Sequence, residues 1–240
     1  MRYISSLWKV SLIGLIVFGC GRSTNSAKED VSAEVKETET PLKVDTFPIL
    51  TEHKLELTKQ YSEINYGTAS YELDSIKMIV VHFTVIPTLH QTLDLFSKDS
   101  LHSNRKYIKN FSALNVGIHY VVDRDGRIYH LMPDSVMARH IIGFNHLSLG
   151  IENIARDASD LTAQQLASNA VLIHFLKQRY PEMEYLIGHD EYNQTDLPHY
   201  QLFKSLDPDY QPYDKPDPGP AFMKDLRQLL KSQYELEFME

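Results

Sequence analysis

Two charged side chains on a proline-rich run are the first candidates for a reactive site. Lys215 and Asp217 each precede a proline in the run Lys-Pro-Asp-Pro-Gly. A residue before proline is biased towards extended backbone, and residues two apart in an extended chain point to the same side. The run therefore predicts a cation and a carboxylate side by side on a stiff loop, although a solvated proline-rich loop also fits this segment alone.

Two histidines at the ends of apolar runs add metal ligands to the candidates. His82 follows Ile-Val-Val, and His189 follows Leu-Ile-Gly. Two neutral imidazoles and one carboxylate would hold zinc and leave a fourth position for water, as catalytic zinc sites do. His82, His189 and Asp217 thus form a candidate zinc site. Their spacing alone supports it weakly, because the chain has 11 histidines and the three residues are far apart.

Short apolar runs predict the strands that must position these side chains. Residues 77–84 are a β-branched run typical of a strand buried on both faces. Residues 117–123 and 128–131 flank an Asp-Gly pair and predict a hairpin. Residues 148–154 predict a strand that carries Glu152 in an apolar run, where an unpaired carboxylate would be costly. A further short strand is expected in residues 185–191.

Two helical patterns complete the expected elements. Thr162 and Gln165 have capping-box spacing, and the apolar periodicity after them continues to Tyr180, which precedes a proline. A closing amphipathic helix is expected over residues 221–238. Strands and helices mix without a strict alternation, so we predict an α/β fold with a central mixed sheet flanked by helices. The long loop before the closing helix is of the kind that borders sites.

The motifs occur together in an order that resembles a known family. The chain resembles the zinc-dependent N-acetylmuramoyl-L-alanine amidases of the amidase-2 family, which share their fold with the peptidoglycan recognition proteins. The resemblance extends over roughly residues 60–225. It rests on five motifs: Ile-Val-Val before His82, Gly-Ile-His-Tyr at 117–120 leading into Asp-Arg-Asp-Gly at 123–126, Gly-Ile-Glu at 150–152, Gly-His at 188–189, and Lys-Pro-Asp-Pro-Gly at 215–219.

The resemblance implies a role for each polar position. His82, His189 and Asp217 match the family's zinc ligands, Glu152 matches its catalytic glutamate, and Lys215 matches the cation at the reacting carbonyl. A bound zinc would lower the pKa of a water towards about 7 and polarise the scissile amide carbonyl. Glu152 would carry the proton to the leaving amine, and Lys215 would stabilise the oxyanion. The expected cofactor is therefore Zn²⁺.

The resemblance also suggests weaker candidates for substrate binding. His119 and Tyr120 lie on an expected central strand, where both a pocket-lining role and a core role are open. His140 and Asn145, with His146, lie in a stretch that resembles the loop covering the glycan side of the family's groove. Arg139 stands where a tryptophan is common, which puts sugar stacking there in doubt.

Two further departures from the family's pattern bear on the substrate. Ile118 replaces a tyrosine that some relatives carry. Residues 190–214, with Tyr192, His199, Tyr200 and Phe203, form an insertion between His189 and Lys215 that we expect to reshape substrate access. Asp190, Glu191 and His199 make a poor second metal site, because they lack paired spacing.

The N-terminal segment predicts export and a lipid anchor. Residues 1–20 are a charged start and an apolar core too short to span a bilayer, ending in Gly-Cys. This pattern predicts a lipoprotein signal peptide with Cys20 as the acylated residue, although an ordinary signal peptide is an alternative. Cys20 is the only cysteine, so no internal disulfide can form. Residues 21–50 are polar and predict a disordered tether, leaving residues 51–240 for the catalytic domain.

Charge and motif content narrow the partners. The net charge is −8 and the pI about 5.8, which argues against a nucleic-acid partner. We expect a monomer in the bacterial cell envelope, anchored to a membrane, most simply the outer membrane facing the periplasm, and acting on peptidoglycan or muropeptides. A non-catalytic peptidoglycan-binding lipoprotein of the same fold and a lipoprotein that only tethers the wall are the alternatives. Retention of all five polar positions favours catalysis.

Overall fold

The computed structural model describes residues 42–101 and 112–239. The predicted signal peptide at 1–20, Cys20 and most of the predicted tether lie outside these ranges. No helix within the described ranges is long and apolar enough to cross a membrane.

The described strands form one mixed sheet, as predicted. Its order is β1-β4-β3-β5-β2-β6, and neighbours are parallel except for the antiparallel pair β3 and β4. That pair is the predicted hairpin. The strands are β1 (Val44–Thr46), β2 (Met78–Phe83), β3 (Tyr120–Val122), β4 (Ile128–His130), β5 (Ser148–Asn153) and β6 (Tyr185–Gly188).

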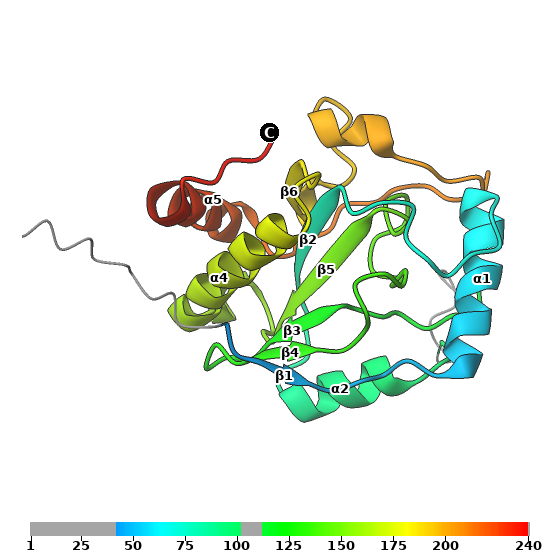
Figure 1. Ribbon diagram of the computed structural model, residues 1–240, viewed down its shortest axis with the longest axis horizontal. Coiled ribbons are helices and arrows are strands. Elements are labelled where there is room, and N and C mark those ends of the chain that lie inside the picture. The colour runs from blue at the N-terminus through cyan, green and yellow to red at the C-terminus, as the bar shows by residue number, and fades with distance from the viewer. Residues whose placement is uncertain (1–41, 102–111, 240) are drawn as a thin grey trace, which may run out of the picture. The chain divides into compact units, whose positions relative to one another are not determined.

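Helices cover both faces of the sheet. Helices α4 and α5 pack side by side on one face, while α1 and α2 lie on the other side (Figure 1). The helices are α1 (Glu52–Tyr66), α2 (Leu89–Ser97), α4 (Ala163–Arg179) and α5 (Pro220–Tyr234), with short 3-10 turns η1 (Ala158–Asp160), η2 (His189–Glu191) and η3 (Pro198–Leu202). Helix α4 starts with the predicted capping box, in which the Thr162 side chain accepts from the Gln165 N–H.

The alternation of side chains along β2 decides on which face a site can form. Ile79 and Val81 pack in the core cluster beneath α4 and α5, whereas Met78 and Val80 pack on the opposite face. All four are fully buried, as expected for a strand covered on both sides. His82 continues the Met78–Val80 series, so its side chain belongs to the face away from α4 and α5. By the same alternation, Glu152 on β5 shares that face.

Three predicted boundaries were wrong. Residues 44–46 form an edge strand that pairs with β4, and Ile49 is buried, so the end of the predicted tether and the predicted domain start at residue 51 lie too late. The cause is that β1 gains its hydrogen bonds from a partner far along the chain, which composition does not reveal. The strand expected at 185–191 ends at Gly188, and the helix expected to reach residue 238 ends at Tyr234.

A buried carboxylate ties the sheet to α4 and gives a prediction on stability. Asp134 accepts hydrogen bonds from the hydroxyls of Tyr120 (2.7 Å) and Tyr180 (2.8 Å), and it lies 3.2 Å from His130 Nε2. Burial would raise the pKa of Asp134, but these three partners lower it from 3.8 to about 2. A lowered folded-state pKa stabilises the protein above the unfolded pKa, and that contribution is lost as pH falls through the folded value.

We therefore expect Asp134→Asn to lower the free energy of unfolding by about 2 kcal/mol at pH 7. The difference from the wild type should shrink as pH falls from about 4 to about 2, because the wild-type carboxyl becomes protonated there. Urea unfolding across this pH range measures it. Asp225→Asn, at an exposed position on α5, is the control and should change stability by less than about 0.5 kcal/mol. A difference that stays constant with pH would contradict the prediction.

Candidate metal centre and active site

The C-terminal ends of three neighbouring parallel strands bring the candidate residues together. The register pairs His82 of β2 with Glu152 of β5, and it pairs Val81 with Gly188 of β6, so His189 follows next to His82. Open parallel sheets bind ligands at this end of their strands. Three residues separated by long stretches of sequence thus meet at one edge because the strand order is β5-β2-β6.

Asp217 completes this group from a loop. Its carbonyl oxygen accepts a hydrogen bond from the Asp190 N–H at 2.8 Å, the Asp217–Pro218 peptide bond is cis, and the residue is buried. The loop passes so close to the end of β6 that a Cβ on Gly188 would lie 2.2 Å from Asp190 Oδ1 and 3.0 Å from Pro218 Cδ. A side chain before His189 would therefore crowd the loop at Pro218 and displace the Asp190 carboxylate.

Three donor atoms from these residues converge. His82 Nδ1 lies 3.0 Å from His189 Nδ1 and 3.2 Å from Asp217 Oδ2, and His189 Nδ1 lies 3.0 Å from the same oxygen. Donors that share one zinc at about 2.0–2.2 Å in a tetrahedron lie about 3.3 Å apart. The donor set of two imidazoles and one carboxylate, with this spacing, fits a zinc ion, and these residues form a group able to hold a metal.

Burial and charge keep these groups in the protonation states that metal binding needs. Burial, followed by the neighbouring His82, lowers the pKa of His189 from 6.5 to about 4, so its imidazole is neutral at neutral pH. Burial alone would raise the pKa of Asp217, but His189 and His82 hold it well below its ordinary value. The carboxylate is therefore ionised. Metal ligands must be deprotonated, so both states favour metal binding.

His140 holds the second nitrogen of the His82 ring. His140 Nδ1 lies 3.0 Å from His82 Nε2, and its own Nε2 lies 3.3 Å from the Ser148 hydroxyl. Partners of this kind orient metal-ligating imidazoles. Gly150 makes room for this ring, because a Cβ there would lie 2.8 Å from His140 Nδ1. His140 also lines the cavity described next, and its predicted role in substrate binding stays a prediction.

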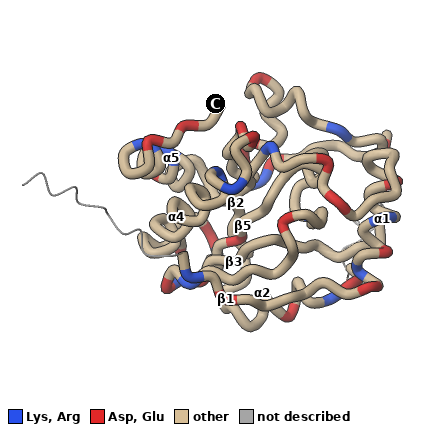
Figure 2. Tube along the Cα trace, viewed as in Figure 1, with Lys and Arg blue, Asp and Glu red and all other residues tan. Residues whose placement is uncertain are grey.

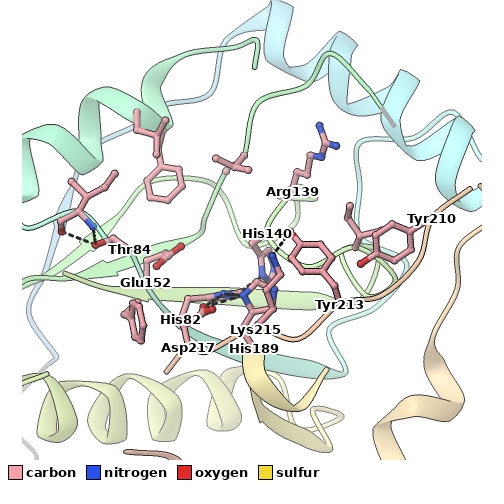
Figure 3. A pocket seen from close by; sticks show the side chains of 17 residues that line it. His82, Thr84, Arg139, His140, Glu152, His189, Tyr210, Tyr213, Lys215 and Asp217 are labelled. Carbon is pink, nitrogen blue, oxygen red and sulfur yellow. Dashed lines mark hydrogen bonds and ion pairs between the residues drawn. The ribbon is translucent and has the colours of Figure 1, made fainter. Parts of the chain in front are cut away.

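A cavity of about 220 Å³ opens at these strand ends. In Figure 3, His82, His189, Asp217 and Lys215 meet near its middle, with Glu152 and Thr84 to one side and Arg139, Tyr210 and Tyr213 to the other. Apolar side chains also line it: Phe83, Ile86, Leu95, Phe96, Val116 and Ile142. We call it the central cavity. It offers a metal-type donor set, a carboxylate and an ammonium group in one space.

Three of the candidate substrate-binding residues do not line the central cavity. His119 is fully buried, where its Nδ1 accepts from the Gly150 N–H and its Nε2 lies 3.0 Å from the Val136 carbonyl oxygen. Tyr120 donates to Asp134. Both His119 and Tyr120 therefore occupy core positions and do not line the cavity.

Asn145 has a structural position as well. Its Oδ1 accepts from the N–H groups of His140 (2.9 Å) and Ile141 (2.7 Å), and its amide donates to the hydroxyl of Tyr61. It shapes the turn that presents His140, so it acts through that residue and makes no contact at the cavity. His146 is also buried, and its ring lies tilted against the Tyr66 ring, with the two centroids 4.5 Å apart.

The cavity wall also contains residues that the sequence did not single out. Tyr210 and Tyr213 line it, whereas Tyr192 and His199 of the insertion (residues 190–214) are buried and do not line it. The insertion is anchored on the segment after His140, since Lys204 N–H donates to the Gly143 carbonyl and the Phe203 ring fills the space that a Gly143 side chain would take. In the sequence, the only indication of this wall was the high density of aromatic residues in the insertion.

Arg139 is buried beside the same cavity. Its guanidinium donates to the backbone carbonyls of Ser112 (3.2 Å) and Leu114 (2.6 Å) and lies over the Tyr61 ring. Elsewhere on the described chain, basic residues are interspersed with acidic ones and form no continuous stretch (Figure 2).

Comparison with known proteins identifies the family. The family model described as N-acetylmuramoyl-L-alanine amidase (Amidase_2) matches residues 72–220, so the chain belongs to this family. The matched range includes His82, His189 and Asp217, together with Glu152 and Lys215.

Individual relatives match the chain at low sequence identity. The chain is 26% identical over 92 residues to an endolysin of Enterobacteria phage K11, covering 36% of this chain and 61% of that protein. The match thus spans about three-fifths of the curated relative. Among solved structures, the chain is similar to the amidase LysC from Clostridium intestinale URNW (24% identity, 55% of this chain and 85% of that one, TM-score 0.40). It is also similar to a selenomethionine derivative of AmpD (20% identity, 78% and 94%, TM-score 0.46).

Proposed function

We propose that the protein is a zinc-dependent amidase that hydrolyses the bond between the N-acetylmuramoyl residue and the L-alanine of the peptidoglycan stem peptide. The family match supports the reaction class. The observation that carries the metal is the convergence of His82 Nδ1, His189 Nδ1 and Asp217 Oδ2 within 3.0–3.2 Å of one another. When bound there, zinc would supply Lewis-acid activation of water and of the scissile carbonyl.

The chain's own residues would divide the remaining work. Glu152, on the strand next to His82 and in register with it, would accept a proton from the attacking water and return it to the departing alanine nitrogen. The Lys215 ammonium would stabilise the negative charge that develops on the carbonyl oxygen. His140 would keep the His82 ring in orientation. The apolar side chains of the cavity would exclude bulk water, which strengthens these charge interactions.

The direct test is mass spectrometry of purified muropeptides incubated with the zinc-loaded protein. Free stem peptide and free disaccharide are the products expected from this bond. Intact muropeptides that nevertheless co-purify with the protein would favour the alternative, a non-catalytic peptidoglycan-binding protein. No binding and no cleavage, with no zinc retained, would favour a lipoprotein that only tethers the wall. A parallel incubation with intact, purified cell wall distinguishes intact wall from released fragments as substrates.

We also propose that the protein is a lipoprotein of the cell envelope, monomeric and anchored through Cys20. The support is the sequence of residues 1–20, with its apolar core followed by Gly-Cys. Cys20→Ala is expected to abolish incorporation of labelled palmitate and to move the protein out of the membrane fraction, because acyl chains supply the membrane affinity. Ser5→Ala, in the same segment, is the control. Equal palmitate labelling of Cys20→Ala and wild type would contradict the anchor.

A further inference from the structure

The ammonium group of Lys215 is held by a tyrosine two residues earlier in the chain. Lys215 Nζ donates a hydrogen bond to the Tyr213 hydroxyl and lies 3.9 Å from the centroid of the Tyr213 ring. Both residues line the central cavity. A lysine ammonium is a point charge on a flexible four-carbon stem, so its position depends on such partners. The hydroxyl and the ring together favour one location of the charge.

Tyr213 is in turn fixed by the buried hydroxyl of Tyr192. The Tyr213 N–H donates to that hydroxyl at 2.8 Å, and the hydroxyl donates to the Tyr213 carbonyl at 3.0 Å. A hydroxyl has one proton and two acceptor sites, so the Tyr210 hydroxyl, 3.2 Å away, is the donor in the remaining contact. Tyr192 is only 1% exposed. Both backbone polar groups of Tyr213 are therefore bonded to a single immobile side chain.

The same tyrosine connects Lys215 to the candidate metal ligands. Tyr192 follows the turn that begins at His189, and the two rings lie 5.3 Å apart. Lys215 stands two residues before Asp217 in the chain. The Tyr192 hydroxyl thus joins the two ends of the insertion directly, although about twenty residues lie between them. Both tyrosines, Tyr192 and Tyr213, belong to this insertion.

We propose that Tyr213, held by Tyr192, is a positioning residue that places the Lys215 ammonium for its role at the reacting carbonyl. The inference deepens the proposed amidase function and rests on it. Tyr213 acts through Lys215 and is assigned no contact with the scissile bond. The insertion, on this basis, contributes to the reaction step and not only to substrate access.

Steady-state kinetics on a purified disaccharide-peptide substrate tests the proposal. Tyr213→Phe keeps the ring and removes the hydroxyl, and it should lower kcat about tenfold, the effect of one hydrogen bond to a charged group, with KM changed less than about twofold. Lys215→Met should lower kcat further. The double variant should be no slower than Lys215→Met alone, because the two residues act as one unit. Tyr129→Phe, on β4 and outside the cavity lining, is the control and should match the wild type.

A second readout does not depend on activity. The protein is reductively methylated with ¹³C at its lysines, and the Lys215 methyl resonance should be displaced by the ring current of Tyr213. The resonance is assigned by its loss in Lys215→Arg. In Tyr213→Leu, the Lys215 resonance should return to the ordinary lysine position. Wild-type kcat in Tyr213→Phe, an additional loss in the double variant, or an undisplaced resonance would each overturn the proposal. A wild type that shows the displaced resonance but cleaves no muropeptide would instead refute the amidase function.

Discussion

Replacing His82 with alanine is expected to remove zinc from the protein and to abolish its amidase activity. His82 supplies one of three converging donor atoms, and loss of even an outer-shell partner of a metal ligand commonly weakens metal binding about 10–100-fold. Loss of a ligand itself should weaken metal binding by more than this factor. Lewis-acid stabilisation contributes several kcal/mol, so we expect kcat to fall at least about 10³-fold. Zinc per molecule, by atomic emission after dialysis, and muropeptide cleavage are the measurements.

The matched control for this variant is His174→Ala. His174 is a half-buried imidazole on α4, stacked on Tyr234, and α4 covers the opposite face of the sheet. It should leave zinc content and cleavage unchanged. Circular dichroism should report the same secondary structure for both variants, because the hydrophobic clusters on the two faces of β2 remain. Full zinc occupancy in His82→Ala would show that zinc is bound elsewhere and would contradict the proposed site.

The strand-end positions of the candidate ligands could be predicted from sequence because they depend on local signals. A β-branched run marks β2 as central, and a histidine after such a run lies at the end of a strand. The resemblance to the amidase-2 family then selected two of the 11 histidines, His82 and His189, and added Asp217 as the third ligand. Local signals could not show which of these residues lie next to one another, because the pairing of His82 with Glu152 depends on strand order across the whole sheet.

Elements that depend on distant partners were the ones missed. Helix α1 buries Lys54, Thr58, Ser62 and Asn65 beside its apolar residues, so its apolar periodicity is obscured. The Lys54 ammonium is accommodated because it donates to the Phe96 carbonyl at the end of α2. Helix α2 is short, and β1 has only three residues. In each case tertiary contacts outweigh a weak local pattern.

Side-chain orientation inside the site was also unpredictable from sequence. His119 and His140 both belong to motifs of the family, yet one bonds to backbone in the core and the other to His82 Nε2. Gly150 contributes to the position of the His140 ring, because a Cβ at residue 150 would lie 2.8 Å from His140 Nδ1. The cavity wall formed by Tyr210 and Tyr213 depends in the same way on how the insertion folds back onto residues 141–147, which no short motif encodes.

Replacing Glu152 with glutamine should separate metal binding from proton transfer. The amide keeps the shape of the side chain but cannot accept the water's proton, and general acid–base catalysis contributes about 10²–10⁴-fold. We expect kcat to fall within that range while zinc content stays at the wild-type level, because Glu152 is not among the converging donors. KM should change little, since the lost interaction belongs to the transition state. Zinc analysis and muropeptide kinetics on one preparation provide both values.

The control for Glu152→Gln is Glu184→Gln, which makes the same chemical change at a half-buried position just before β6, at the other end of that strand. It should retain wild-type kcat and zinc. The comparison is informative because Glu152 sits on β5 directly beside His82, whereas Glu184 lies at the end of β6 away from the candidate ligands. Full turnover in Glu152→Gln would remove this residue from the mechanism and leave proton transfer to another group at the cavity, whereas loss of zinc in the same variant would mean that the carboxylate supports the metal site.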